Sequence, residues 1–509
     1  MPDQQSSRIE PGLASYLAVG AVALLVGAGQ AATKTWSTPD FWLLLGPVRE
    51  LAAHPFNPSH PLVIGSGDDP YMSPYSWLLG ILTRLSTASP ITVMAVAGVA
   101  NLVLILAGLW RLARRFSAAS LAPTLTLIFV LTAWGWAPWR WSGYLNLNSL
   151  GSVLPFGSAF ATGIGLHLLA SFDAWLDHGR ARDLLAVSLA FPLVLLAHPL
   201  TGAWVGLFGM TLVVLRAKVL GRSGLLLAAA AAIVSCALIL IWPFYSVVDL
   251  LRSSDSFDGF NAAVFRKLVP RTFLALPGVV IVVARLQRSS SDRLGIVAVT
   301  IGLAFAVAAI TDRAALGRIF PGLLLALHLA MGDWFGSRIQ QLSRRHKIVR
   351  AATALICVVG LSGTATGWIR AIPHSLLPER LTKDSRLSSQ VTPYLGLGTI
   401  IRPGSNVAAD DSVSLLVGAV SGKVIDVVTP LPFAVDHDQR ARDQRAILDP
   451  DTSATTRDKL VRRYSVQWFV VPDADAERLL DAAVGTELVG SVNSLSILRL
   501  DPAEPQLDP

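Results

Sequence analysis

The chain has 509 residues, a formal charge of +8 at pH 7, 52% hydrophobic residues and only 15% charged residues. A soluble globular chain averages roughly 25% charged residues, so this chain lacks the charge that a soluble surface needs. The composition excludes an ordinary soluble enzyme, a disordered chain and a fibrous protein. Because the apolar residues form long uncharged runs, we expect a polytopic α-helical membrane protein.

The basic residues indicate the kind of partner to expect, and the two cysteines bear on disulfides and metal sites. The pI is near 9.8, but the basic residues lie in short clusters between apolar runs, which is typical of cytoplasmic loops. We therefore expect membrane lipids, and no nucleic acid, as partners. Cys236 and Cys357 lie inside apolar runs, so neither a disulfide framework nor a Cys-x-x-Cys metal site is expected.

The apolar runs predict about eleven membrane spans of roughly 20 residues or somewhat fewer. The first run follows a polar start with a single basic flank, so it is predicted to be a retained span and not a cleavable signal. The predicted spans are 13–32, 90–110, 120–137, 155–172, 184–199, 200–215, 223–242, 273–286, 294–310, 319–335 and 349–369.

Lys and Arg in the short loops predict the orientation. With the N-terminus in the cytoplasm every inner loop is basic, for example Arg111–Arg115 and Arg344–Lys347. We expect a multi-pass protein of the plasma membrane whose residues after about 370 lie outside the cell. The apolar segment 74–86 is short, and as a span it would invert every later loop. It is interpreted as a re-entrant or interfacial helix.

Two predicted domains follow from this topology: a membrane domain over 1–370, with a long first outer loop over 33–89, and an extracytoplasmic α/β domain over 371–509. In the tail, the patterns predict strands at 412–419, 423–428, 466–471 and 491–500, and helices at 452–464 and 473–484.

The first outer loop supplies the candidate acidic groups. A helix is predicted over Asp40–Ala53, opened by Thr38 as cap and Pro39 in the first turn. Asp40 fits two interpretations: a general base or metal ligand at the bilayer surface, or a helix-start residue that favours the helix dipole.

Asp68 and Asp69 are adjacent carboxylates in a Gly-rich turn, close to Tyr71. They could hold a divalent cation such as Mg²⁺ or Mn²⁺, raise each other's pKa, or simply form the turn. Arg49, His54 and His60 lie in the same loop, where Arg49, His60 and Tyr71 are candidates for substrate binding.

Other polar residues lie near the predicted outer surface or at membrane depth. His198, in a His-Pro-x-x-Gly break, is either a functional ionisable group or a structural residue that ends a helix. The outer tryptophans, which include Trp141, form either an interfacial belt or a stacking wall for sugar or lipid. Arg313 and Arg318 could bind a lipid phosphate or extend to headgroups. The remaining candidates for substrate binding are Arg140 and Asn146.

These features together resemble the GT-C glycosyltransferases, which take sugars from polyprenyl-phosphate donors. The motif-like stretch from His60-Pro61 to Leu79 is part of this resemblance. The stretch Pro74 to Leu85, followed by Ser89-Pro90 and an apolar span that ends at Arg111–Arg115, is similar to the second block of the mannosyltransferase and aminoarabinose-transferase branch. The tail block Lys459–Val471 resembles an element of soluble domains in that group. The resemblance implies that Asp40 is the base, and it maps Asp68 and Asp69 loosely onto a second acidic element. No family motif maps onto His198.

The resemblance implies glycosyl transfer with inversion to an envelope glycan, lipid or protein acceptor on the outer face. The Ala-rich, Arg-over-Lys composition suggests an actinobacterial source, where such enzymes build arabinan and mannan, so an arabinofuranosyl- or mannosyltransferase of the cell wall is expected. Two other classes stay open: a transporter, and a non-catalytic or polymerase-type protein of envelope assembly. Almost charge-free span centres and one long asymmetric loop disfavour the transporter.

Overall fold

The computed structural model describes residues 11–34, 36, 39–65, 67–253, 257–339, 344–382, 391–428, 436–483 and 485–500. The chain forms two compact units. The first comprises residues 1–35, 95–242 and 257–388, and the second comprises 36–94, 243–256 and 389–509. Residues 36–89, most of the loop that the sequence predicts to be the first outer loop, thus belong to the same unit as the tail.

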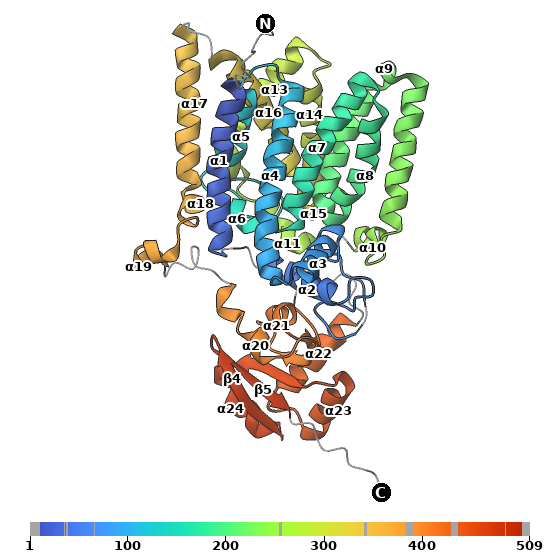
Figure 1. Ribbon diagram of the computed structural model, residues 1–509, viewed down its shortest axis with the longest axis vertical. Helices are drawn as coiled ribbons and strands as arrows, with labels where there is room; N and C mark the ends of the chain where they lie inside the picture. Colours follow the sequence, from blue (N-terminus) through green and yellow to red (C-terminus); the bar gives the residue numbers. More distant parts are fainter. Residues whose placement is uncertain are drawn as a thin grey trace, which may run out of the picture. The chain divides into compact units, whose positions relative to one another are not determined.

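The first unit is helical (Figure 1). Within the described residues, seven helices of the chain are long and apolar enough to cross a membrane. Each of the eleven predicted spans overlaps a helix. These helices are α1 (Pro11–Ala32), α4 (Pro90–Phe116), α5 (Ala122–Thr132), α7 (Gly157–His178), α8 (Ala181–Ala197), α9 (Pro199–Leu240), α13 (Leu276–Arg288), α14 (Arg293–Ile310), α16 (Phe320–Ile339) and α17 (Arg344–Gly363).

Helix α9 contains two of the predicted spans, 200–215 and 223–242. Gly221 interrupts it with φ 63° and ψ −172°, a backbone conformation that glycine adopts without steric cost. The other helices of this unit are short: α6 (Leu150–Val153), α11 (Asp258–Asn261), α12 (Leu268–Thr272), α15 (Ala314–Gly317), α18 (Ala365–Ile369) and α19 (Glu379–Thr382).

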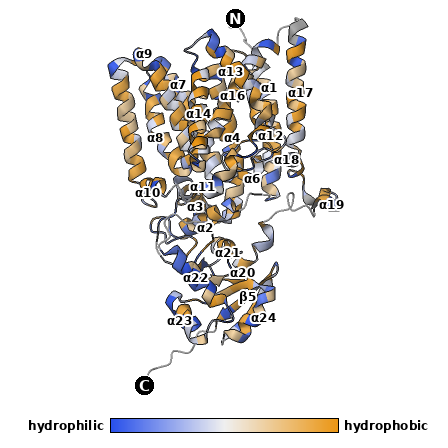
Figure 2. Cartoon of the chain, turned by 180° about the vertical axis from the view of Figure 1, so that it is seen from behind, coloured by the Kyte–Doolittle hydropathy of each residue, from blue (hydrophilic) through white to orange (hydrophobic). Residues whose placement is uncertain are grey.

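Close helix packing builds the core of the first unit. A Cβ added at Gly332 of α16 would lie 2.9 Å from the carbonyl oxygen of Ala122, so only glycine lets α16 and α5 approach this closely. Figure 2 shows that apolar residues dominate these helices. Leu25 and Ile310 are 74% and 85% exposed, as expected for side chains that face lipid. The chain is a multi-pass membrane protein.

The second unit contains α2 (Asp40–Ala53), α3 (Pro74–Ser86) and α10 (Val247–Arg252), together with a five-stranded sheet in the order β2-β1-β3-β5-β4. The strands are β1 (Asn406–Ala409), β2 (Lys423–Val424), β3 (Trp468–Pro472), β4 (Thr486–Val492) and β5 (Leu495–Leu500). Strand β1 pairs in parallel with β2 and β3, and β5 pairs antiparallel with β3 and β4. The helices of the tail are α20 (Leu397–Ile400), α21 (Ser414–Val420), α22 (His437–Leu448), α23 (Ala454–Tyr464) and α24 (Asp473–Ala482).

The structure corrects parts of the predicted tail. The strand predicted at 412–419 is wrong, because Ser414–Val420 is the helix α21; a short apolar run fits a buried helix as well as a strand. The strand predicted at 491–500 is the end of a hairpin, since Asn493 and Ser494 turn the chain with φ of 50° and 63°, as in a type I′ turn. The predictions missed β1 and α22. The helices predicted at 452–464 and 473–484 correspond to α23 and α24.

Candidate active site

Asp40 is the first residue of α2, whose observed bounds, Asp40–Ala53, match the predicted helix. Pro39 occupies the N-cap position, and the expected cap Thr38 lies outside the described residues. The Asp40 side chain is half-buried. A carboxylate in the first turn is favoured by the helix dipole, so its position fits both a catalytic and a helix-start role.

Asp69 and His60 face each other in the interior of the second unit. Asp69 is 1% exposed and His60 is 2% exposed. Oδ1 of Asp69 accepts the backbone N–H of Tyr71 at 2.7 Å, and Oδ2 lies 3.8 Å from Nε2 of His60. Among the described residues neither Oδ2 nor Nε2 has a hydrogen-bond partner. The structure therefore brings together two of the predicted site residues.

The backbone determines the tautomer of His60. Its Nδ1 accepts the N–H groups of Leu62 and Val63 at 3.2 and 3.1 Å, so the ring proton resides on Nε2. Burial lowers the pKa of His60 to about 4, and the charges of Lys423 and Arg440 act in the same direction. Although the distance is within the range of an ion pair, the contact is a neutral imidazole N–H facing a carboxyl group.

The two adjacent carboxyl groups differ in environment. Burial raises the pKa of Asp69 to about 7, against the backbone hydrogen bond from Tyr71. Asp68 is exposed, and partial burial together with the charge of Asp249 raises its pKa as well. A carboxyl group that titrates near neutral pH, with one free oxygen, has the properties of an acid–base group.

Arg49, a predicted substrate-binding residue, forms hydrogen bonds with backbone carbonyl groups of the protein. Its guanidinium donates to the carbonyl oxygens of Gly418, Ala419 and Ser421, the last at 2.6 Å. These carbonyls lie at the C-terminal end of α21, where helix carbonyls have no partner in the helix. The contacts of Arg49 are those of a helix cap.

A second candidate site lies in the first unit, where aromatic rings surround two arginines. The guanidinium of Arg271 lies 4.7 Å from the ring centre of Trp139. That of Arg318 lies 5.1 Å from Trp141 and 5.4 Å from Tyr144. Trp139 and Tyr144 are fully buried, with ring centres 5.2 Å apart. These rings form a cluster inside the protein, whereas Trp136 is 61% exposed. We call Trp139, Trp141, Tyr144, Arg271 and Arg318 the Trp139–Arg318 cluster.

The Trp139–Arg318 cluster has hydrogen-bond donors without acceptors. Tyr144 Oη, Trp139 Nε1 and Arg271 Nε are all buried, and none has a hydrogen-bond partner within the described part of the chain. Burial raises the pKa of Tyr144 to about 12, so the phenol keeps its proton. Unsatisfied buried donors are costly, and two nearby cations add positive charge, so an anion fits this cluster.

The other predicted residues have varied surroundings. Arg318 also donates to Oδ1 of Asn261 at 2.7 Å. Arg313 lies 3.9 Å from Asp258. Asn146 donates to the carbonyl of Trp139 and accepts the N–H of Ser149. Arg140 is exposed, and Tyr71 and Trp141 are half-buried.

His198 separates α8 from α9, as the sequence predicted. Its Nδ1 accepts the backbone N–H of Thr201 at 3.2 Å, so the imidazole caps α9. A Cβ at Gly143 would lie 3.5 Å from its Cε1, which places His198 beside the loop that carries the tryptophans. An apolar cavity of the first unit lies in the same region, lined by Trp134, Gly143, Thr162, Trp204 and His328.

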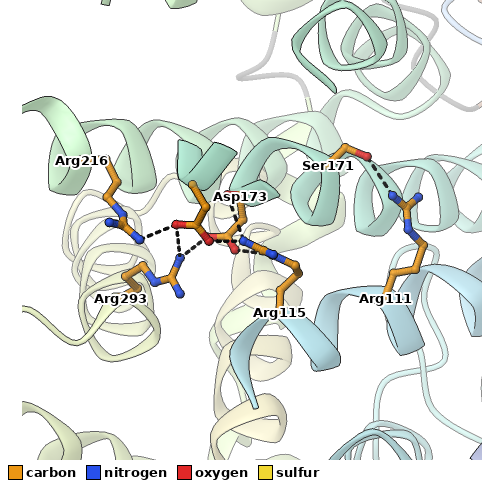
Figure 3. Close-up of polar contacts among 7 residues, drawn as sticks. Arg111, Arg115, Ser171, Asp173, Arg216 and Arg293 are labelled. Atoms are coloured by element: carbon orange, nitrogen blue, oxygen red, sulfur yellow. Dashed lines mark hydrogen bonds and ion pairs between the residues drawn. The ribbon is translucent and has the colours of Figure 1, made fainter. Parts of the chain in front are cut away.

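Sequence reasoning missed two features of the first unit. Arg271 was not singled out, although an arginine on the predicted outer side runs against the positive-inside pattern. The second feature is an ion network on α7 (Figure 3), where Arg115, Arg216 and Arg293 approach α7 from three other helices.

In this network, Arg115 and Arg293 bind separate oxygens of the fully buried Asp173 at 2.7 and 2.6 Å. Arg216 binds Asp177 at 2.6 Å. The Asp-x-x-x-Asp spacing, which places both carboxylates on one helix face, was the available signal.

No protein-family model and no curated protein matches the chain by sequence. Solved structures match it in fold. The arabinofuranosyltransferase AftD from Mycobacteria aligns with a TM-score of 0.56 and 14% identity, over 95% of this chain and 40% of AftD. ArnT from Cupriavidus metallidurans in the apo state aligns with a TM-score of 0.55 and 12% identity, over 95% and 96% of the two chains.

ArnT bound to undecaprenyl phosphate aligns with a TM-score of 0.52 and 15% identity, over 96% and 98% of the two chains. The Archaeoglobus fulgidus oligosaccharyltransferase tethered to an acceptor peptide aligns with a TM-score of 0.53 and 11% identity, over 92% and 70%. This chain thus spans about two fifths of the length of AftD and nearly the whole of ArnT. Its fold is that of the GT-C membrane glycosyltransferases.

Proposed function

We propose that the chain is an integral-membrane glycosyltransferase that moves a sugar from a polyprenyl-phosphate donor to an envelope glycan, lipid or protein on the outer face of the plasma membrane. The observation that carries the proposal is the alignment with ArnT bound to undecaprenyl phosphate, which covers nearly all of both chains. The donor-rich Trp139–Arg318 cluster supports the same class of substrate, because a lipid phosphate is an anion.

The proposed reaction is a single displacement with inversion. A carboxylate takes the proton of the acceptor hydroxyl, and the hydroxyl oxygen forms a bond to the anomeric carbon of the sugar. The bond between that carbon and the phosphate oxygen breaks, and the polyprenyl phosphate leaves with the electron pair. Cations and hydrogen-bond donors near the leaving oxygen would stabilise the charge that develops on the departing phosphate.

Asp40 is the proposed base, and Asp69 is the second candidate. Asp40 is supported by its place in the first turn of α2, directly after the first span. Asp69 is supported by its free Oδ2 and by a pKa of about 7, because an acid–base group works best when its pKa lies near the operating pH. Nε2 of His60 faces Oδ2 of Asp69 at 3.8 Å, so a small closing movement would let the imidazole N–H donate to the carboxyl group and orient it.

A divalent cation at Asp68 and Asp69 stays a prediction. Within the described residues no group of three or more His, Cys, Asp and Glu side chains could hold a metal ion. Two carboxylates would leave most of the coordination sphere of Mg²⁺ or Mn²⁺ to substrate oxygens and water. The proposed mechanism therefore routes no step through a metal.

The donor sugar is proposed to be arabinofuranose or mannose. The test is a transfer assay in which the purified chain receives radiolabelled polyprenyl-phosphate arabinofuranose or polyprenyl-phosphate mannose, with short glycans as acceptors. We expect product from one donor, with the opposite anomeric configuration. Product with a retained configuration would contradict the single displacement. If both donors are bound and carried across a vesicle membrane without transfer, the protein is a transporter.

A further inference from the structure

The segment 60–65 of the second unit is added to the edge of the tail's sheet. Val63 forms a parallel bridge with Val424 of β2. The backbone N–H of Ile64 donates to Val424 O at 2.8 Å, and the N–H of Val424 donates to Leu62 O at 2.9 Å. The backbone that carries His60 therefore pairs with a strand more than 350 residues later in the sequence.

Arg440 of α22 binds this segment and the strand region together. Its Nη1 donates to the carbonyl oxygen of Ile64 at 2.8 Å and to that of Ile425 at 3.1 Å. Next to Ile64 the chain turns at Gly65 with φ +109°, where an added Cβ would lie 3.5 Å from Nη2 of Arg440. The N–H of His60 closes the turn by donating to Gly65 O at 3.3 Å.

A second cation from the tail ties down the start of the segment. Lys423 Nζ lies 3.3 Å from Oε2 of Glu50 and hydrogen-bonds Ser59 Oγ. Oε1 of Glu50 in turn accepts the N–H and hydroxyl of Ser59 at 2.8 and 2.7 Å. Both ends of the turn that holds the His60 ring are thus fixed by residues of the tail.

We propose that Arg440 is a positioning residue for the acidic site: by bridging the carbonyls of Ile64 and Ile425 it holds the 60–65 turn so that Nε2 of His60 faces Oδ2 of Asp69. The inference deepens the proposed function, in which Asp69 is a candidate acid–base group, and rests on it for its effect on turnover. It gives the tail a part in the reaction.

The first test is hydrogen–deuterium exchange of the full chain in detergent, read on peptides that cover residues 60–71. Arg440→Gln removes the charge-assisted hydrogen bonds to both carbonyls, and such a bond corresponds to roughly 10-fold in a local opening equilibrium. We expect exchange of these peptides to become about 10-fold faster. Arg442→Gln is the matched control, because Arg442 lies on the same helix, is exposed and contacts Gln439.

Arg440→Lys is a second variant that keeps the inference testable if Arg440→Gln fails to fold, because lysine keeps the positive charge with a single donor group. We expect its exchange to lie between those of wild type and Arg440→Gln. Equal exchange in the Arg440→Gln, Arg442→Gln and wild-type proteins would overturn the positioning role.

Turnover separates this inference from the proposed function. If Asp69 is the acid–base group, Arg440→Gln lowers kcat about 10-fold with little change in the KM for the donor, and Arg440→Lys restores part of it. A loss of turnover in Asp69→Asn with normal turnover in Arg440→Gln would overturn the positioning inference and leave the proposed function intact. Normal turnover in Asp69→Asn would remove Asp69 from the mechanism, and the exchange data alone would then decide whether Arg440 holds the turn.

Discussion

The imidazole Nε2 of His60 lies 3.8 Å from Oδ2 of Asp69, and both side chains are buried. Burial raises the pKa of Asp69 to about 7 and lowers that of His60 to about 4. The two shifts favour the neutral form of each partner. The titration of Asp69 and the titration of His60 therefore change the stability of the folded chain in opposite directions as pH rises.

Asp69→Asn and His60→Gln should therefore change the pH dependence of stability in opposite directions. Between about pH 4 and 6.5 the folded chain keeps a proton on Asp69 that the unfolded chain has lost, so this group makes stability fall as pH rises. The unfolded chain binds a proton on His60 that the folded chain does not, so this group makes stability rise with pH. Each contributes up to about 1.4 kcal/mol per pH unit, and the two nearly cancel in the wild type.

The measurement is the apparent Tm in detergent across this pH range. We expect Asp69→Asn to gain stability with rising pH relative to wild type, and His60→Gln to lose it. If both variants keep the wild-type slope, the two groups have ordinary pKa values in the folded chain.

Asp40→Asn should lower turnover by at least about 10²-fold, with folding and donor binding retained, because general-base catalysis typically contributes about 10²–10⁴-fold. A helix-start role predicts instead a stability loss of about 0.3–1 kcal/mol and near-normal turnover. Asp475→Asn is the control, because Asp475 is an acidic residue in the first turn of another helix, α24, and its side chain is exposed. Steady-state turnover and Tm of the two variants decide between the roles.

Arg271→Gln and Arg318→Gln should weaken binding of the donor through the loss of hydrogen bonds to its phosphate. A charge-assisted hydrogen bond contributes about 1.5–3 kcal/mol, which corresponds to roughly 10- to 150-fold in Kd for the lipid. Arg266→Gln, at an exposed arginine of the same unit, should bind normally. Titration with undecaprenyl phosphate in nanodiscs measures the effect, and unchanged affinity in both cluster variants would place the phosphate elsewhere.

Asp173→Asn should destabilise the first unit by about 1.5–3 kcal/mol, since it removes the fully buried carboxylate that binds Arg115 and Arg293 and leaves both arginines only their ion pairs with Asp177. Asp312→Asn is the control: Asp312 is exposed, and asparagine tolerates its φ of 53°. Thermal unfolding in detergent should show a large loss of Tm for the first variant alone. A similar Tm for both would mean that the ion network adds nothing to stability.

A cysteine placed at Arg442 should react with a membrane-impermeant thiol reagent on intact cells, whereas one at Lys347 should react only after permeabilisation. This result is expected if the basic loops lie in the cytoplasm, as the positive-inside rule predicts. Cys236 and Cys357 are first replaced by serine. Labelling of Lys347→Cys on intact cells, without labelling of Arg442→Cys, would invert the topology.

Local pattern determined much of the fold from the sequence alone. The uncharged runs predicted the helical spans, because a bilayer requires long apolar helices whose backbone groups are satisfied internally. The bounds of α2 followed from a proline at its start and apolar periodicity. The short run Ser412–Ala419 misled because its few apolar residues fit a buried helix as well as a strand.

The tertiary structure alone decided which of these residues meet. Arg49 caps α21 across 372 positions, Arg440 holds Ile64 across 376 positions, and Arg271 lies on Trp139. The sequence indicated Asp69 and His60 as candidates. It could not show that both side chains are buried, with Oδ2 of Asp69 facing Nε2 of His60. Periodicity and turn residues report contacts a few positions apart, whereas burial, and with it the pKa of each group, depends on packing between segments that are distant in sequence.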